Sequence, residues 1–218
     1  METKSCPVCG GTVWIPILYG LPGPELFAAA ERGEVALGEC MVETDQPDEV
    51  CARCNARASS PTLYVLTGLP GAGKSTHAAA LAATTGARHV AMDDAVHAAG
   101  LSLVDYEARF ALQPSIEASI PLLLAEGESV IAEFGSWGRE ERDRLRGLAD
   151  GTGARTELHW ADAPLEVCRE RILARGGLGA EDLAGAVLDS SRDLFDRPTP
   201  EEGAAYDAFV TVSSSTTF

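Results

Sequence analysis

Apolar and polar positions follow a regular order along most of the chain. From about residue 61 onward, short apolar runs of strand length are followed by longer segments in which apolar residues recur at helical spacing. This pattern predicts strands at 63–66, 88–92, 129–134, 156–160 and 209–212. It predicts helices at 77–83, 105–126, 139–149, 164–175 and 180–195, and Pro114 and Pro121 are expected to divide the second of these into two. Strands that alternate with helices predict an α/β fold, in which helices cover both faces of a parallel sheet.

The first 57 residues are expected to form a separate, small domain. Residues 14–19 have the composition of an extended segment, and residues 24–32 that of a short helix ending at Gly33. Such a short segment buries too little apolar surface to fold by that means alone. Residues 57–61 have the serine and proline content of a linker. The sequence therefore predicts two domains, at 1–57 and 62–218.

The overall composition narrows the class of partner. The chain has 218 residues, of which 45% are hydrophobic, enough for a packed core. No apolar run has the length of a membrane span, and the first six residues lack the apolar centre of a secretory signal, so we expect a cytoplasmic protein with no membrane contact. A formal net charge of −16 repels phosphate backbones and argues against nucleic acid as a partner. Small-molecule substrates fit this charge better.

The strongest chemical signal is a glycine-rich segment after the first predicted strand. It satisfies the phosphate-binding pattern G-x-x-x-x-G-K-[ST], and an alanine-rich helix follows it, so a chance glycine turn is a poor alternative. In such a loop the backbone N–H groups surround a polyphosphate. Lys74, one of two lysines in the chain, is predicted to reach the terminal phosphates, and the Ser75 hydroxyl to bind Mg²⁺. The predicted cofactor-binding residues are Gly68, Leu69, Pro70, Gly71, Ala72, Gly73, Lys74, Ser75 and Thr76.

Two C-x-x-C pairs near the N-terminus predict a zinc site. Four thiolates in this arrangement bind Zn²⁺ tetrahedrally in structural sites, and the metal would supply much of the folding free energy of so small a domain. Two disulfides or a redox pair are the alternatives, which a cytoplasmic chain and the absence of a preceding βαβ unit disfavour. Cys40 lies between the pairs and could replace one ligand, whereas Cys168 is expected to be a core residue. The predicted zinc ligands are Cys6, Cys9, Cys51 and Cys54.

Two acidic residues lie where predicted strands end, and ligands gather at the carboxyl ends of strands in open α/β sheets. Asp93 follows the second strand, and Glu133 closes the third. We expect Glu133 to hold Mg²⁺ together with Ser75, and Asp93 to accept the proton of an attacking hydroxyl. The alternative for Asp93 is the N-cap of a helix.

Three arginines occupy the predicted helix that runs into a glycine-rich segment at 176–179. Arginines on a mobile lid can close over the phosphates during phosphoryl transfer. Arg175, nearest the glycines, is the predicted catalytic arginine, while a solvent-exposed helix face is an equal alternative for Arg169 and Arg171. The histidines lack the spacing of a metal site or a triad, so no such role is expected for His77, His89, His97 or His159.

Residues 62–207 resemble the P-loop kinases of the predicted-kinase, zeta-toxin, chloramphenicol-phosphotransferase and polynucleotide-kinase type. The likeness rests on segments 68–76, 131–146, 166–175 and 195–202 and on Asp93, and the N-terminal segment is similar to a zinc-ribbon-like, cysteine-containing extension of some bacterial members. The resemblance implies a P-loop NTPase-type, five-stranded parallel sheet, ATP with Mg²⁺, and phosphoryl transfer to a hydroxyl, with Asp93 as the base and Arg175 on the lid. The chain departs from the family at Glu133, where an aspartate is usual.

Two functions of different classes fit these features. The first is an ATP-dependent kinase that phosphorylates a hydroxyl of a small molecule or nucleoside, with Asp93, Lys74 and Arg175 as catalytic residues. The chain has no guanine-selecting N-K-x-D pattern, which favours ATP over GTP. The second is an ATP-switched binding module whose zinc segment contacts a protein or nucleic-acid partner. A polynucleotide kinase is a third possibility, which the acidity of the chain disfavours.

Overall fold

The computed structural model describes residues 4–6, 8–41, 46–55, 57–101, 106–176 and 180–213. The chain divides into two compact units, residues 1–60 with 125–127 and residues 61–124 with 128–218. Within the described residues, no helix combines the length and the apolar character that crossing a membrane requires. Two features expected from the sequence, the helix start at Asp105 and the glycines of 177–179, lie outside the described residues.

The first unit contains a four-stranded sheet of order β2-β1-β3-β4. The central strands β1 (Trp14–Leu18) and β3 (Glu49–Cys51) are antiparallel, with Trp14 opposite Cys51. The short strands β2 (Ala36–Leu37) and β4 (Arg57–Ala58) complete the sheet. Helix α1 (Pro24–Glu31) begins with a proline, and the chain leaves it through Gly33 in a left-handed conformation (φ 73°). The extended segment and the helix predicted here are both present.

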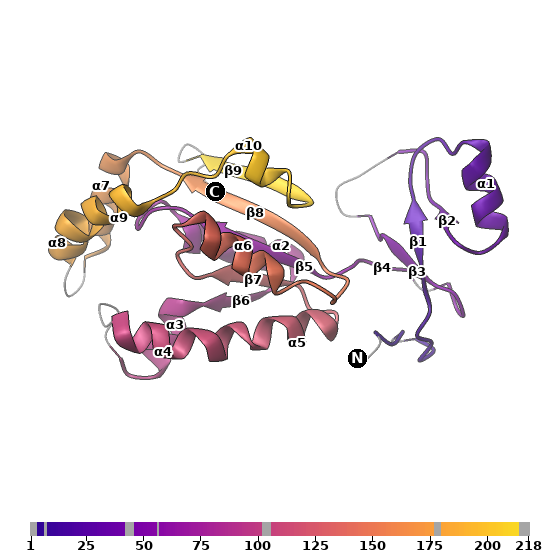
Figure 1. The fold of residues 1–218 in the computed structure, drawn as a ribbon, viewed down its shortest axis with the longest axis horizontal. Coiled ribbons are helices and arrows are strands. Elements are labelled where there is room, and N and C mark those ends of the chain that lie inside the picture. The colour runs from indigo at the N-terminus through magenta and orange to yellow at the C-terminus, as the bar shows by residue number, and fades with distance from the viewer. Residues whose placement is uncertain are drawn as a thin grey trace. The chain divides into compact units, whose positions relative to one another are not determined.

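The second unit is built on a five-stranded sheet of order β6-β7-β5-β8-β9, in which all neighbouring strands are parallel (Figure 1). Its strands are β5 (Thr62–Thr67), β6 (Arg88–Ala91), β7 (Val130–Glu133), β8 (Arg155–Asp162) and β9 (Ala208–Ser213). The chain order and the parallel pairing confirm the predicted α/β fold class.

The central strand β5 is buried along its whole length because helices pack on both of its faces. Leu63 and Val65 belong to a core cluster with residues of α5 (Ser119–Ala125) and α6 (Arg139–Gly147). Tyr64 and Leu66 point to the other face and pack near Ala78 of α2 (Lys74–Thr85). Because side chains alternate between the two faces of a strand, β5 packs against helices on both sides of the sheet.

The remaining helices are α3 (Met92–Ala98), α4 (Tyr106–Glu117), α7 (Leu165–Arg175), α8 (Ala180–Asp182), a π-helical segment η1 (Leu183–Val187), α9 (Leu188–Leu194) and α10 (Pro200–Gly203). Helices α3 and α10 were not among the predicted helices, and two predicted elements differ in detail. The second strand ends at Ala91 because α3 begins at once. The helix predicted at 180–195 is broken at Gly185, whose φ of −93° and ψ of −113° are not helical. The long helix predicted before β7 is two helices, as its prolines indicated.

A buried ion pair fixes the loop that follows β7. The Arg142 side chain is fully buried and donates to both carboxylate oxygens of Glu202, at 2.6 and 2.8 Å. It also donates to the carbonyl oxygens of Ser136 and Trp137, at 3.2 and 3.0 Å. The Thr67 hydroxyl donates to the Ser136 carbonyl as well, at 2.8 Å. The end of β5 and the loop after β7, where the candidate site lies, are therefore joined by hydrogen bonds through the Ser136 carbonyl.

Candidate functional site

The glycine loop between β5 and α2 has a backbone that larger residues could not adopt. Gly68, Gly71 and Gly73 have φ values of 144°, 78° and 106°. A Cβ on Gly68 would lie 2.6 Å from the Ala161 carbonyl oxygen, and one on Gly71 would lie 2.5 Å from that of Cys168. The loop thus packs closely against the end of β8 and the first half of α7. This is the local structure that the phosphate-binding pattern predicts.

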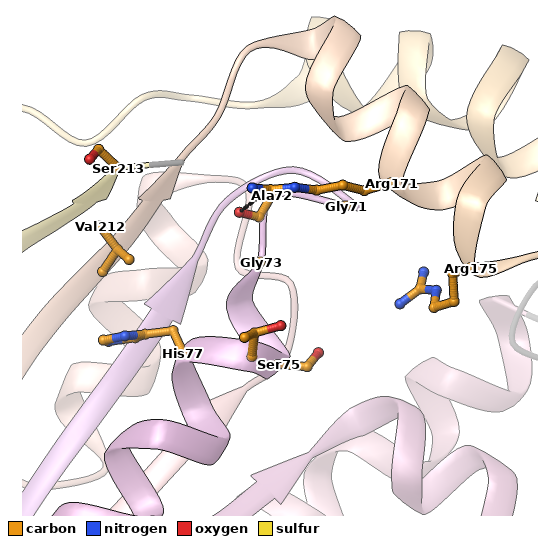
Figure 2. A pocket seen from close by; sticks show the side chains of 10 residues that line it. Gly71, Ala72, Gly73, Ser75, His77, Arg171, Arg175, Val212 and Ser213 are labelled. Carbon is orange, nitrogen blue, oxygen red and sulfur yellow. Dashed lines mark hydrogen bonds between the residues drawn. The ribbon is translucent and has the colours of Figure 1, made fainter. Parts of the chain in front are cut away.

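A pocket of about 350 Å³ opens beside this loop, and Figure 2 shows the side chains around it. It lies between the glycine loop, helix α7 and the last residues of β9, at the carboxyl end of the sheet. Of the predicted cofactor-binding residues, five line it. The lining residues are Gly71, Ala72, Gly73, Ser75, Thr76, His77, Arg171, Arg175, Val212 and Ser213.

Two arginines of α7 line the pocket, and one does not. Arg175, the predicted catalytic arginine, is the last residue of the helix, and its side chain is exposed. Arg171 donates from Nη1 to the Ala72 carbonyl oxygen of the glycine loop, at 3.2 Å (Figure 2). Arg169 instead bonds the Ala184 carbonyl and Asp189, which gives it a packing role. Arg171 and Arg175 are four residues apart and therefore lie on one face of α7. This spacing is the feature of the sequence that could have predicted Arg171 as a pocket residue.

The Lys74 side chain lies against the glycine loop. Its Nζ donates to the carbonyl oxygens of Gly68 and Leu69, at 2.9 and 3.1 Å. Burial lowers the pKa of Lys74, and the negative charges of Glu133 and Asp93 partly oppose this effect. These two carboxylates, both predicted site residues, are therefore close enough to Lys74 to act on its charge.

Ser75, Glu133 and His89 form a continuous chain of hydrogen bonds. The Ser75 hydroxyl donates to Glu133 Oε1 at 2.7 Å, and His89 Nε2 lies 2.9 Å from Glu133 Oε2. Burial acts to raise the pKa of Glu133, but the bonds from His89 and Ser75 and the charge of Lys74 outweigh it and lower the pKa. The bond to Glu133 in turn raises the pKa of His89. The contact between His89 and Glu133 could not be predicted from sequence spacing, because it joins two neighbouring strands that are far apart in the sequence.

The donor set at Ser75 and Glu133 fits Mg²⁺. A hydroxyl oxygen and a carboxylate oxygen are hard ligands, and these two already lie within hydrogen-bond distance of each other. Magnesium binds through few protein ligands and keeps waters and substrate phosphates as the others. The Glu133 carboxylate, which the sequence predicted to act with Ser75, thus meets the Ser75 hydroxyl.

Asp93 lies in the first turn of α3, and most of its side chain is exposed. The N-cap of this helix is Ala91, so the alternative role of Asp93 as the N-cap does not apply. Its Oδ1 accepts a hydrogen bond from Arg109 of α4 at 2.6 Å. The sequence analysis did not single out Arg109, which comes from a helix that packs on α3.

A second contact that the sequence did not predict involves His77, which lines the pocket. His77 Nε2 is 2.7 Å from His159 Nδ1, and His159 Nε2 is 3.0 Å from a carboxylate oxygen of Glu157. A carboxylate accepts only, so His159 carries its proton on Nε2, and neutral His77 donates through its own Nε2. Burial and the neighbouring imidazole lower the pKa of His77, which keeps it neutral.

The four predicted zinc ligands of the first unit come together. The Sγ atoms of Cys6, Cys9, Cys51 and Cys54 all lie within 4.8 Å of one another. The Cys6–Cys54 and Cys9–Cys51 sulfur distances are 3.5 and 3.7 Å. A tetrahedral zinc with bonds of about 2.3 Å would place its sulfur ligands about 3.8 Å apart. The residues present therefore fit zinc, and Cys40, which is exposed, is outside the cluster.

The two knuckles share one backbone design. Gly10 and Asn55 follow the second cysteine of each pair with φ values of 71° and 59°, and each N–H bonds the carbonyl of the first cysteine. Backbone N–H groups of Arg53 and, less strongly, Cys54 lower the pKa of the Cys51 thiol to about 7. A thiol that ionises this easily is suited to metal binding. Cys168 is buried in the second unit, as expected of a core residue.

Strand, glycine loop and helix, on a parallel sheet whose first strand lies at the centre, define a protein of the P-loop kinase fold. Residues 63–198 match the model of the AAA domain family AAA_33, and the chain belongs to this family. No match was found among curated protein sequences.

Solved structures share this fold over most of the second unit. A putative kinase from Chloroflexus aurantiacus is 24% identical with a TM-score of 0.55, over 72% of this chain and 90% of that one. The Mycobacterium tuberculosis APS kinase CysC, in complex with AMPPNP and APS, is 21% identical with a TM-score of 0.55, over 72% and 91%. Chaetomium thermophilum Kti12, in complex with ADP-AlF3, is 19% identical with a TM-score of 0.53, over 71% and 90%.

Proposed function

We propose that the chain is a kinase that transfers the terminal phosphoryl group of ATP to a hydroxyl of a small molecule or nucleoside. The observation that carries this proposal is the Ser75–Glu133 contact directly beside Lys74, at the start of the helix that follows the glycine loop. A metal-binding hydroxyl, an acidic partner and a lysine at a phosphate loop are the parts that phosphoryl transfer from a nucleoside triphosphate needs.

The residues of the candidate site have separate roles in this proposal. The backbone of residues 68–76 and the Lys74 ammonium bind the phosphates, and Arg171 and Arg175 face them from α7. Ser75 and Glu133 would hold Mg²⁺, which neutralises charge on the phosphates when bound. Two of the similar structures are described as kinases, and one of those holds AMPPNP, which supports the reaction class.

Asp93 is the proposed base for the acceptor hydroxyl. It is exposed, and its negative charge acts to raise the pKa of Lys74. The Arg109 contact at 2.6 Å restrains the carboxylate, so that an oxygen can be presented to a bound acceptor. The acceptor itself would bind near α3 and α4.

A labelled-ATP screen of metabolites and nucleosides, followed by Asp93→Asn on the best acceptor, tests this function. We expect Asp93→Asn to lower phosphoryl transfer by at least about 100-fold while ATP affinity stays the same. Asp94→Asn is the matched control, since Asp94 is the exposed neighbour in the same helix turn and should keep the parental rate. Unchanged transfer in Asp93→Asn would refute the role of Asp93.

An ATP-switched binding module is the second candidate function. The observation in its favour is that the ATP-binding unit is joined to a separate unit with its own four-cysteine cluster. Phosphate release measured with and without acceptors separates the two candidates. Turnover that depends on an acceptor supports the kinase, whereas ATP-dependent partner affinity without turnover supports the switch.

We also propose that the cysteine cluster binds a structural zinc ion and that the chain has two domains, at 1–57 and 62–218. The sulfur distances and the two matching knuckles support zinc. The division of contacts into two units supports the boundary. Zinc would then stabilise the smaller domain, which has few buried apolar side chains of its own.

A further inference from the structure

His89 is placed by sheet geometry to act on Glu133. Their strands β6 and β7 pair in parallel, with His89 opposite Ile131 and Ala91 opposite Glu133. Side chains two residues apart on a strand share a face, and opposite residues share it too. Ile131 packs with Ala78 of α2, so His89 and Glu133 also project toward the α2 face, where Ser75 lies in the first turn of the helix.

Because the Glu133 side chain is longer than that of an aspartate, its carboxylate needs a second contact to fix its position. A glutamate has one more rotatable bond than an aspartate, so its carboxylate has more positions to choose from and more entropy to lose when fixed. His89 Nε2 holds Oε2 at 2.9 Å, and Ser75 holds Oε1 at 2.7 Å. The Glu133 side chain is only 11% exposed and His89 26%, so neither end of the contact is a loose surface group.

We propose that His89 is a positioning residue for Glu133: by holding Oε2, it leaves Oε1 directed at Ser75 and at the Mg²⁺ of bound ATP. This inference rests on the proposed function, since it assumes that Ser75 and Glu133 receive the metal. His89 itself would touch neither metal nor nucleotide. It belongs to the class of residues that orient a metal ligand, whose loss typically costs about 10- to 100-fold in metal affinity.

Calorimetry with a non-hydrolysable ATP analogue, in excess Mg²⁺ and again in EDTA, tests the inference. The ratio of the two dissociation constants measures how much the metal strengthens binding. We expect His89→Ala to reduce this ratio at least about tenfold while the dissociation constant in EDTA stays within about twofold. His89→Gln keeps an N–H donor and should restore part of the ratio. His97→Ala, an exposed histidine on α3, is the control and should leave the ratio as in the parent.

A double variant distinguishes positioning from simple stabilisation. If His89 acts through Glu133, then His89→Ala combined with Glu133→Ala should lose no more of the ratio than Glu133→Ala alone. If Glu133→Ala loses the ratio but His89→Ala keeps it, the His89 inference is overturned and the proposed function stands. If the parent protein binds the analogue equally well with and without Mg²⁺, the metal role of Ser75 and Glu133 fails, and the inference fails with it.

Discussion

At the scale of single residues, the proposed phosphate binding at the site depends on the partly buried ammonium group of Lys74. Lys74 is partly buried, and its ammonium group bonds two carbonyl oxygens of its own loop. Burial lowers its pKa, while nearby carboxylates act in the opposite direction. A triphosphate would replace the weak carbonyl partners by anionic oxygens, which form stronger, charge-assisted hydrogen bonds.

Lys74→Ala should therefore weaken ATP binding by about 10- to 100-fold, the range expected when a hydrogen bond to a charged group is lost. The chain offers a matched control in Lys4→Ala, since Lys4 is its other lysine and lies in the first unit. Calorimetry with ATP and Mg²⁺ on both variants is the measurement. Equal affinities in the two variants would contradict the binding role of the glycine loop.

The His89–Glu133 pair should give the metal-free protein a stability that depends on pH. The raised pKa of His89 stabilises the fold below its ordinary value near 6.5, and this contribution is lost as the pH rises through the raised pKa. The lowered pKa of Glu133 stabilises the fold above its ordinary value near 4.5, and this contribution is lost as the pH falls through the lowered pKa. The stability difference between the parent and His89→Gln should thus be largest between about pH 4.5 and 6.5. Thermal unfolding in EDTA across this range measures it, and a difference independent of pH would contradict the ion pair.

At the scale of elements, the glycine loop combines strained backbone with close packing. Gly71 and Gly86 both have positive φ, at 78° and 70°, but only Gly71 faces another backbone atom, the Cys168 carbonyl oxygen. Gly86 follows the last residue of α2, and a Cβ added there would meet no atom within 4 Å. The two positions therefore separate the cost of the left-handed conformation from the cost of a clash.

Gly86→Ala should destabilise the protein by about 1–2 kcal/mol, the cost of a left-handed alanine. Gly71→Ala should cost more than that, and it should also abolish ATP binding, because the loop must move away from α7. Urea unfolding and ATP calorimetry on both variants test this. If both variants lost the same stability and kept their ATP affinity, α7 would have moved to make room for the added methyl group, and the prediction would be wrong.

At the scale of the whole molecule, the two units rest on different sources of stability. The second unit has a continuous apolar core around β5. The first unit has few buried apolar side chains, among them Ile17 and Val50, and two of its buried residues are cysteines of the cluster. A domain of about 60 residues is only marginally stable by apolar burial, and below about 40 residues folding usually needs a metal, disulfides or a partner.

Cys9→Ser should therefore lower the zinc content and unfold the first unit while ATP affinity is kept. Cys40→Ser, which changes an exposed cysteine outside the cluster, should keep both zinc and structure. Zinc per chain, limited proteolysis of residues 1–60, and ATP calorimetry are the measurements. Stoichiometric zinc in Cys9→Ser would contradict the four-cysteine site.

Much of the fold and part of the site could be predicted from the sequence, because they depend on local patterns. The period of apolar residues identified β5 and its parallel neighbours. The glycine spacing identified a loop in which Gly68, Gly71 and Gly73 have positive φ values that favour glycine. Helix α3 was missed because seven residues are too few to show a helical period, and the break at Gly185 was missed because a single-residue dihedral change leaves the apolar period intact.

The sequence by itself determined the α/β class, the glycine loop with Lys74 and Ser75, and the two cysteine knuckles. Each of these depends on residues near one another along the chain. Only the tertiary structure decided that His89 meets Glu133, that Arg109 meets Asp93, and that Arg142 is buried against Glu202. Such pairs depend on strand order, register and helix packing, which are set by the fold as a whole and leave no periodic trace in the residues themselves.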